Sequence, residues 1–313
     1  MTKQLMPLLF LSMAAAPHIR GQVFSLTREQ MIKYTAQNPF ERFPDSRPKV
    51  PDALLEKLKE MSAEEVLGLN LRGYHYQWEA GWQVLHPNKT LIGRAVTLQM
   101  MPLRPDVSAV DQADRMAKHQ LRLNHRTAID MLQKGDVLVV DASGAQFGGV
   151  IGGNPAYIIM KTTGTGFVID GAIRDIRGIA PFDLAGYYRA GAPPAIHDLM
   201  VTGINVPIRI GSATVMPGDV VFGDPEGVYF IPPGQVQDLV DEADVTHIHN
   251  DWTKKKFDEG KYVSTDIYSR PHDPALIKEY EAYLKEKLGA QRYEEYMKGR
   301  QAPRGTSAQQ PPR

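Results

Sequence analysis

The segment from Gly135 to Gly191 constrains the fold of this chain more than any other stretch. It contains two short apolar runs, at 137–140 and 167–169, and an aspartate follows each run. Short runs rich in β-branched residues and bounded by glycine and aspartate predict buried strands. A glycine-rich turn and a helix-length segment, 155–163, separate the two runs. The order strand, loop, helix, strand predicts a parallel crossover unit, and therefore an α/β fold.

Residues able to bind an anion and a cation follow these two strands. The glycine-rich turn, with glycines at 148, 149, 152 and 153, follows the first strand, and Arg174-Asp175 follows the second. Open α/β sheets bind ligands at the carboxyl ends of their strands, beside helix N-termini. We therefore expect the active site here.

The two side chains and the glycine turn suggest a division of roles. The Asp175 carboxylate is a hard oxygen ligand suited to Mg²⁺ or Mn²⁺, and the planar fork of Arg174 matches the carboxylate of an organic acid. Backbone amides at Gly152 and Gly153 would bind the same anion. The alternative for the dipeptide is a structural ion pair at a strand-to-helix turn.

Composition excludes several classes of function. The chain of 313 residues carries 36 acidic and 36 basic residues, which disfavours a nucleic-acid-binding surface. It contains no cysteine, so disulfides, thiolate metal sites and cysteine nucleophiles are excluded.

The first 21 residues have the pattern of a signal peptide. Lys3 precedes an apolar run from Leu5 to Ala16 that ends in small residues, and Gly21 follows. This pattern predicts export to the periplasm or outside the cell, and the run is too short to span a bilayer. The alternative is an ordinary apolar N-terminal helix, which would leave the protein in the cytoplasm.

The remainder divides into four predicted parts. Residues 22–54 form an N-terminal helix, opened by a Thr27 capping box, and a proline-rich arm that is extended rather than a core element. Residues 55–250 form the main domain, residues 251–300 a helical extension with one helix over 275–298, and residues 301–313 a disordered tail. Within the main domain the sequence predicts a strand over 90–101, a helical segment over 109–132, short strands between 206 and 231, and a helix over 235–251.

A spaced set of motifs is typical of one known family. The motifs are GDVLVVD at 135–141, the Gly153 loop, DGAIRD at 170–175, YYRAG at 187–191, PGDVV at 217–221 and DPEGV at 224–228. In these motifs the chain resembles the RraA-like proteins over about residues 55–250. That family includes the class II 4-hydroxy-4-methyl-2-oxoglutarate/oxaloacetate aldolases and the regulators of ribonuclease E activity.

The resemblance implies a swivelling β/β/α fold in a homotrimeric ring, sometimes a hexamer, with active sites at subunit interfaces. It implies that Asp175 holds a divalent cation, Mg²⁺ or Mn²⁺, and that Arg174 binds the pyruvyl carboxylate. The segment Gly153-Asn154-Pro155-Ala156 would complete the substrate pocket with its amides. The implied reaction is metal-assisted retro-aldol cleavage, or decarboxylation of oxaloacetate, through a metal-stabilised pyruvate enolate.

The chain departs from the family pattern near this site. Asn154 stands where the family often has glutamate, Pro155 has no N–H, and Arg177 lies where an acidic residue is common. Carboxylates that could compensate, some from a neighbouring subunit, are Asp141, Asp224 and Glu226. These departures predict a small 2-oxo or hydroxy acid different from the usual substrates.

Other histidines and aspartates have less specific interpretations. His197-Asp198 could act as an acid–base pair, although a surface-loop position is expected, and His247 and His249 should diverge on a helix rather than bind metal. Asp170 should brace its turn.

Two alternative functions remain. A non-catalytic, protein-binding ring of the ribonuclease-regulator type is the first, although that branch departs from the Arg-Asp pair that this chain keeps. A methyltransferase is the second, and it has no supporting methyl-donor motif.

Overall fold

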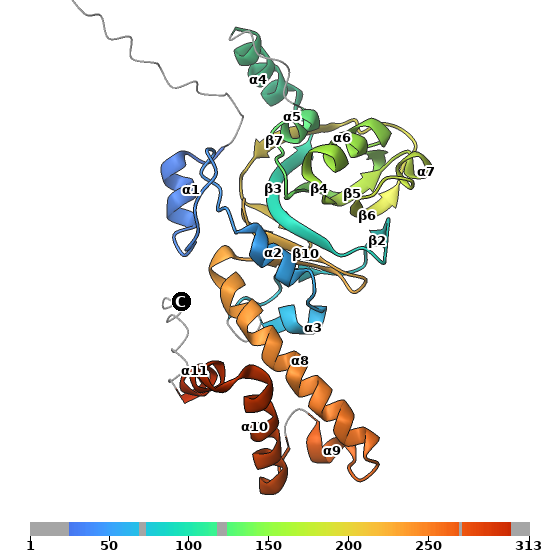
Figure 1. Ribbon diagram of the computed structural model, residues 1–313. Helices are drawn as coiled ribbons and strands as arrows, with labels where there is room; N and C mark the ends of the chain where they lie inside the picture. The colour runs from blue at the N-terminus through green and yellow to red at the C-terminus, as the bar shows by residue number, and fades with distance from the viewer. Residues whose placement is uncertain (1–24, 69–72, 118–123, 269–270, 302–313) are drawn as a thin grey trace, which may run out of the picture.

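The computed structural model describes residues 25–68, 73–117, 124–268 and 271–301, and a nine-stranded mixed sheet organises them (Figure 1). In spatial order the strands are β1 (Trp78–Glu79), β11 (Val228–Ile231), β10 (Val220–Gly223), β3 (Leu91–Pro102), β4 (Asp136–Gly149), β5 (Gly166–Ile173), β6 (Ala185–Gly191) and β2 (Gln83–Val84); β7 (Leu199–Ile204) also pairs with β3. A separate hairpin consists of β8 (Ile208–Ile210) and β9 (Ala213–Val215).

The predicted crossover unit is confirmed. Strands β3, β4, β5 and β6 run parallel, and α6 (Gly153–Thr163) connects β4 to β5. The prediction that Gly148 and Gly149 belong to a turn is wrong, because β4 continues through both residues. Gly149 remains extended because its N–H donates to the Pro194 carbonyl and its own carbonyl accepts from the Ile196 N–H. Strands β6 and β7 were not predicted from the sequence.

The remaining helices cover the sheet or extend from it. They are α1 (Arg28–Tyr34), α2 (Asp52–Leu58), α3 (Ala63–Val66), α4 (Pro105–Ala117), α5 (His125–Ile129), α7 (Ile176–Ile179), α8 (Val236–Asp258) after a 3₁₀ turn (Pro233–Gln235), α9 (Ser264–Ile267), α10 (Pro274–Leu288) and α11 (Ala290–Gln301). Helices α5, α6 and α7 lie on one face of the parallel strands (Figure 1). The β8–β9 hairpin packs on the other face, and α2, α3 and α8 cover the β10–β11 end.

The alternation of side chains along β4 explains this layering. Leu138 and Val140 pack with the helices, whereas Val137 and Val139 pack with the hairpin residues, and all four are fully buried. A strand buried on both faces carries a continuous apolar run instead of an alternating pattern. The run at 137–140 therefore places β4 at the centre of the domain.

The N-terminal arm is a core element, contrary to expectation. Arg47 is fully buried and donates from both terminal nitrogens to the Asp136 carboxylate at 3.1 Å, while its Nε donates to Asp45 at 2.7 Å. Val50 is also fully buried. Prolines keep the arm extended, but the ion pair with Asp136 fixes it against the first residue of β4.

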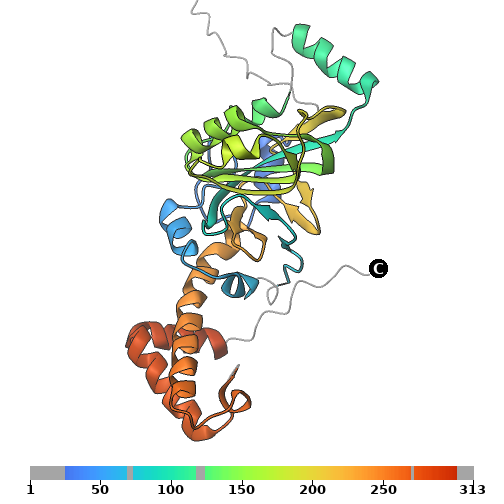
Figure 2. The same cartoon turned by 90° about the vertical axis from the view of Figure 1, so that its right-hand side faces the viewer.

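The C-terminal extension is a helical module at the opposite end of the molecule from α4 (Figures 1 and 2). Helix α8 runs from the sheet into this module, where Trp252, Ile267 and Leu276 form a separate apolar cluster. The single helix predicted over 275–298 is instead two, because Gly289 has a φ of 80° that ends α10.

The predicted leader and residues 302–313 lie outside the described residues. Within the described ranges, no helix is long and apolar enough to cross a lipid bilayer.

Candidate active site

A cavity of about 950 Å³ lies where the predicted site was expected. The ends of β4 and β5, the N-termini of α5 and α6, and the segment 193–196 form its walls. Of the predicted site residues, Gly153, Asn154, Pro155, Arg174 and Asp175 line it. Its volume falls within the range of typical small-molecule sites.

Glycines at the start of α6 and in α7 leave room for Arg174 and Asp175. A Cβ atom at Gly152 would lie 3.2 Å from the Arg174 side chain, and one at Gly153 would lie 2.6 Å from Asp175 Oδ2. A Cβ at Gly178 would lie 2.5 Å from Asp175 Oδ1. The Asp175 carboxylate therefore sits between the backbones of α6 and α7, at a distance that only glycine permits.

Asp175 has an uncommon backbone conformation. It precedes α7 with a φ of 57° and a ψ of 38°, in the left-handed region, where aspartate is better tolerated than most residues. Its carbonyl accepts hydrogen bonds from Gly178 and Ile179, which fixes the turn. Its carboxylate is exposed and has neither a hydrogen bond nor an ion pair with any described residue. The side chain is therefore free to bind a ligand.

Arg174 is positioned by its backbone and has a free side chain. Its N–H donates to the Ile151 carbonyl at 2.9 Å, which ties β5 to the loop before α6. Its guanidinium is exposed and forms no ion pair with a described residue, Asp175 included. The structure thus does not contain the structural ion pair considered as the alternative for this dipeptide.

The N-terminus of α6 supplies two amides. Gly152 caps the helix, and no described residue accepts from the N–H groups of Gly153 and Asn154. Pro155 has no N–H. Ala156 does not reach the cavity, because its side chain is fully buried and its N–H donates to the Gly152 carbonyl. An anion beside Gly153 would also interact favourably with the positive end of the helix dipole.

Sequence reasoning missed His125 and Arg126, which line the same cavity from α5. Asn124 caps that helix, accepting from the Arg126 N–H at 2.8 Å, and so fixes the first turn. Burial lowers the pKa of His125, and the positive charges of Arg126 and Arg174 lower it further. The imidazole is therefore neutral at pH 7. The capping pattern Asn-His-Arg-Thr predicts a helix start here but gives no sign that it faces the glycine turn.

The carboxylates predicted to compensate lie elsewhere in the chain. Asp170 lies within β5 and not in the turn where it was predicted, and it accepts from Arg189 Nε at 2.7 Å. Asp141 is its neighbour in the pairing of β4 with β5. Burial raises the pKa of Asp141. Asp224 closes its own turn by accepting from the N–H of Glu226. None of these carboxylates lines the cavity.

The three histidines considered from the sequence also lie apart from the cavity. His197 bonds Asp198 at 2.7 Å in an exposed loop and contacts the Phe147 ring. His247 Nε2 lies 2.7 Å from Glu65 Oε1, and His249 packs against Tyr280. Among the described residues, no three His, Cys, Asp or Glu side chains converge as a metal cage.

Known proteins share this architecture. The profile of the RraA-like family, described as Aldolase/RraA, matches residues 49–230, which is more than half of the chain. A candidate 4-hydroxy-4-methyl-2-oxoglutarate aldolase of Halalkalibacterium halodurans is 39% identical over 110 residues, covering 35% of this chain and 52% of that protein. Another from Shewanella oneidensis is 37% identical over 95 residues, covering 30% and 57%. The chain spans about half the length of these curated relatives.

A solved structure gives the same result for the fold. Streptomyces coelicolor RraAS2, described as an unusual member of the RNase ES inhibitor RraA protein family, superposes with a TM-score of 0.57 at 26% identity, covering 68% of this chain and 100% of its own. The predicted α/β fold of the RraA-like type, with added N- and C-terminal regions, is confirmed. The chain therefore belongs to the RraA-like family.

Proposed function

We propose that this protein is a divalent-cation-dependent carbon–carbon lyase, of the aldolase or decarboxylase type, that acts on a small 2-oxo acid. The observation that carries the proposal is the position of Arg174 and Asp175, both unpaired, over the two free amides at the start of α6. This arrangement presents donors for a carboxylate beside a ligand for a cation. The names of the aldolase relatives support the reaction class.

Arg174 binds the carboxylate of the substrate. A guanidinium fork donates two parallel hydrogen bonds to a carboxylate, which fixes the orientation of the acid as well as its position. The N–H groups of Gly153 and Asn154 donate to the same end of the substrate. The neighbouring 2-oxo group is then directed toward Asp175.

The residues present fit a magnesium- or manganese-type ion held with few protein ligands. Among the residues that the structure describes, Asp175 and Asp130 are the carboxylates that line the cavity. Such ions are often held by one or two carboxylates, with waters and substrate oxygens as the other ligands. The ion would polarise the 2-oxo group as a Lewis acid.

His125 handles the proton in this proposal. A neutral imidazole can accept the proton of a 4-hydroxyl group while the C3–C4 bond breaks and its electron pair moves toward the 2-oxo group. The new carbonyl compound leaves, and the pyruvate enolate is then protonated at C3. Arg126, on the same wall, suits a second carboxylate, so a dicarboxylic substrate such as oxaloacetate or a 4-hydroxy-2-oxo diacid fits best.

Pyruvate release tests this function. The full chain would be assayed with oxaloacetate and 4-hydroxy-4-methyl-2-oxoglutarate, with Mg²⁺ or Mn²⁺ and with chelator. Asp175→Asn and Arg174→Lys should each lose most of the turnover, whereas Arg177→Ala, a nearby exposed arginine outside the cavity, should retain it. Turnover that chelator leaves unchanged would contradict the proposal.

The second candidate is a non-catalytic ring that binds a protein partner. The likeness to the Streptomyces coelicolor protein, which belongs to a ribonuclease-inhibitor family, favours it. No turnover on either substrate, together with no binding of Mn²⁺, would favour this function over the enzyme.

We further propose that the protein is a homo-oligomer, a trimer or hexamer. Helix α4 projects from the body (Figure 2), and its Val110 and Met116 side chains are 64% and 75% exposed, which supports a contact between copies. Light scattering of the purified chain measures the mass directly.

The predicted leader would place the protein in the periplasm or outside the cell, and mass spectrometry of the exported N-terminus tests this.

A further inference from the structure

One apolar side chain in the candidate active site has no role in the reaction proposed above. Ile158 lies in α6, one turn after the two free amides, and it lines the cavity with 48% of its surface exposed. Side chains in a helix lean toward its N-terminus, so Ile158 lies over the turn that holds Asn154. Apolar surface is therefore available to a substrate whose carboxylate is bound at the start of α6.

The residue next to Ile158 has a similar exposure but a different position. Tyr157 is 47% exposed, does not line the cavity, and packs edge-to-face against Phe182 with ring centroids 5.5 Å apart. Single exposed apolar side chains are common on protein surfaces and need no explanation. What distinguishes Ile158 is that its exposed surface belongs to the cavity.

The segment 193–196 adds apolar surface that is fixed in place. Pro193 and Ala195 are exposed, Ile196 is half-buried, and all three line the cavity. Two backbone hydrogen bonds with Gly149 hold this segment against β4. Apolar groups on a fixed backbone form a surface that need not be reordered when a substrate binds.

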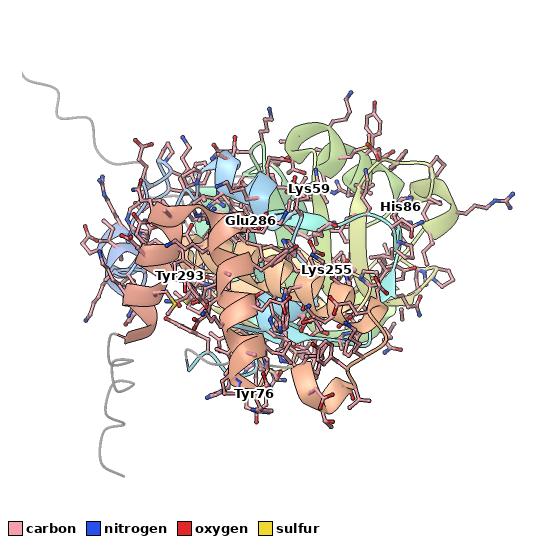
Figure 3. The ribbon with its side chains drawn as sticks, turned by 60° about the horizontal axis from the view of Figure 1, so that its bottom comes forward. Lys59, Tyr76, His86, Lys255, Glu286 and Tyr293 are labelled. Carbon is pink, nitrogen blue, oxygen red and sulfur yellow. The ribbon has the colours of Figure 1, made fainter. Side chains whose placement is uncertain are left out.

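The helical extension does not contribute to these walls. All described residues that line the cavity fall between positions 125 and 196. The extension lies at the other end of the molecule (Figure 1), and Figure 3 brings that end forward, with Lys255 of α8, Glu286 of α10 and Tyr293 of α11 labelled. Substrate selection in this cavity therefore depends on the main domain.

Carbon 4 of the proposed substrate carries one group without a partner in the site. In a 4-hydroxy-2-oxo diacid, this carbon bears the hydroxyl group, the second carboxylate and one further group, R. The hydroxyl is assigned to His125 and the carboxylate to Arg126, and both residues line the cavity from α5. The cavity of about 950 Å³ is at the upper end of the usual range of roughly 300–1,000 Å³, which leaves room for an R group larger than methyl.

We propose that R is a branched apolar group that packs against Ile158 and the segment 193–196. This substrate class, the aldol adducts of pyruvate with branched-chain 2-oxo acids, depends on the lyase function proposed above. Cleavage breaks the C3–C4 bond, and the C4 hydroxyl loses its proton and becomes the carbonyl of the branched 2-oxo acid. The electron pair of the broken bond passes to the pyruvate enolate, which then takes up a proton at C3.

Two substrates that differ only in R test the proposal. Pyruvate release by the full chain with Mn²⁺ would be measured for racemic 4-hydroxy-4-methyl-2-oxoglutarate and for its 4-isobutyl analogue, which has three more carbons. A fully buried methylene strengthens binding roughly fourfold, and a half-buried one roughly twofold. We therefore expect kcat/KM to be roughly 10–60-fold higher for the isobutyl compound.

Three variants localise the preference. Ile158→Ala removes three carbons from the wall and should lower the ratio of the two kcat/KM values at least roughly fivefold. Ile158→Leu conserves the volume and should keep the ratio within about threefold of wild type. Tyr157→Ala, at the similarly exposed neighbouring position outside the cavity, should leave the ratio unchanged. Melting temperatures of the variants would show that each is folded.

Two results would contradict the role of Ile158 while leaving the lyase function in place. One is a ratio near one in the wild-type protein, which would show that the cavity does not select a branched R group. The other is an equal fall of the ratio in Ile158→Ala and Tyr157→Ala, which would show that the change does not act through the cavity wall. Absence of pyruvate release from both substrates is a different result, because it would refute the lyase function itself and the substrate class with it.

Discussion

Adding one methyl group at Gly178 tests the geometry of the candidate active site. A Cβ atom at this position would lie 2.5 Å and 2.7 Å from the two carboxylate oxygens of Asp175. Gly178 lies within α7 and does not have a positive φ, so alanine causes no backbone strain there. The atoms it displaces are the end of a flexible side chain. Gly178→Ala should therefore move the carboxylate and leave the fold intact.

The sizes of the two effects follow from these distances. The closest oxygen must retreat from 2.5 Å to an ordinary contact of about 3.4 Å, a shift of roughly 1 Å. A misplacement of about 1 Å in a catalytic group can cost about 100-fold in rate. Alanine is favoured over glycine within a helix by up to about 1 kcal/mol. We expect turnover to fall roughly 100-fold while the free energy of unfolding stays constant or rises slightly.

Pyruvate release at saturating Mn²⁺ and urea unfolding measure the two quantities on the same sample. Gly68→Ala is the matched control, because its added Cβ would come no closer than 3.5 Å to Leu239. A folded Gly178→Ala protein with turnover within about threefold of wild type would refute the reasoning. In that case the position of the Asp175 carboxylate would not limit the reaction.

Three further predictions concern charged groups. Arg47→Met should lower the free energy of unfolding by about 3–5 kcal/mol in urea titrations, because it leaves the fully buried Asp136 carboxylate without its guanidinium; an unchanged value would contradict this. Burial raises the pKa of Asp219 from 3.8 to about 8, so the unfolded chain loses this proton at lower pH than the folded chain does. The free energy of unfolding therefore falls with rising pH between those values, by at most roughly 1.4 kcal/mol per pH unit. Asp219→Asn should remove that decline, as thermal unfolding at pH 5 and pH 8 would show. Arg126→Gln removes a positive charge that lowers the pKa of His125, so the acidic limb of the pH–rate profile should move to higher pH; a limb that stays in place would separate His125 from the reaction.

Local patterns predicted the centre of the fold well. The crossover from β4 through α6 to β5 was predictable because each element is short, continuous in sequence and bounded by glycine or aspartate. The capping box at Thr27 marks a helix start for the same reason, since the residues that form it are three apart. Patterns of this kind depend only on neighbours in the sequence.

Features that depend on distant partners were not predictable. The sequence around Arg47 has the composition of an exposed arm. Its partner Asp136 lies 89 residues away in the sequence. Strand β7 has an ordinary mixed sequence and is fixed by pairing with β3, about 100 residues earlier. In both cases the tertiary contact decides burial, and no local pattern records it.

The candidate site divides in the same way, and the glycines explain why half of it could be recognised. Arg174 and Asp175 lie next to each other, and Gly152 and Gly153 mark the backbone that their side chains approach. A glycine required by close approach is visible in the sequence, so those positions signal the site even without knowledge of the partner.

His125 and Arg126 approach the cavity from α5 by side chain alone and need no glycine. Their contribution could be found only from the structure, and it is also the part of the site on which a choice between one substrate and another would depend. At the start of α6, Asn154 carries no charge and Pro155 has no N–H, whereas the wall from α5 presents an imidazole and a guanidinium to the cavity. The groups on the α5 wall suit an anionic substrate, and kinetic comparison of Arg126→Gln on one- and two-carboxylate substrates would measure what the guanidinium contributes.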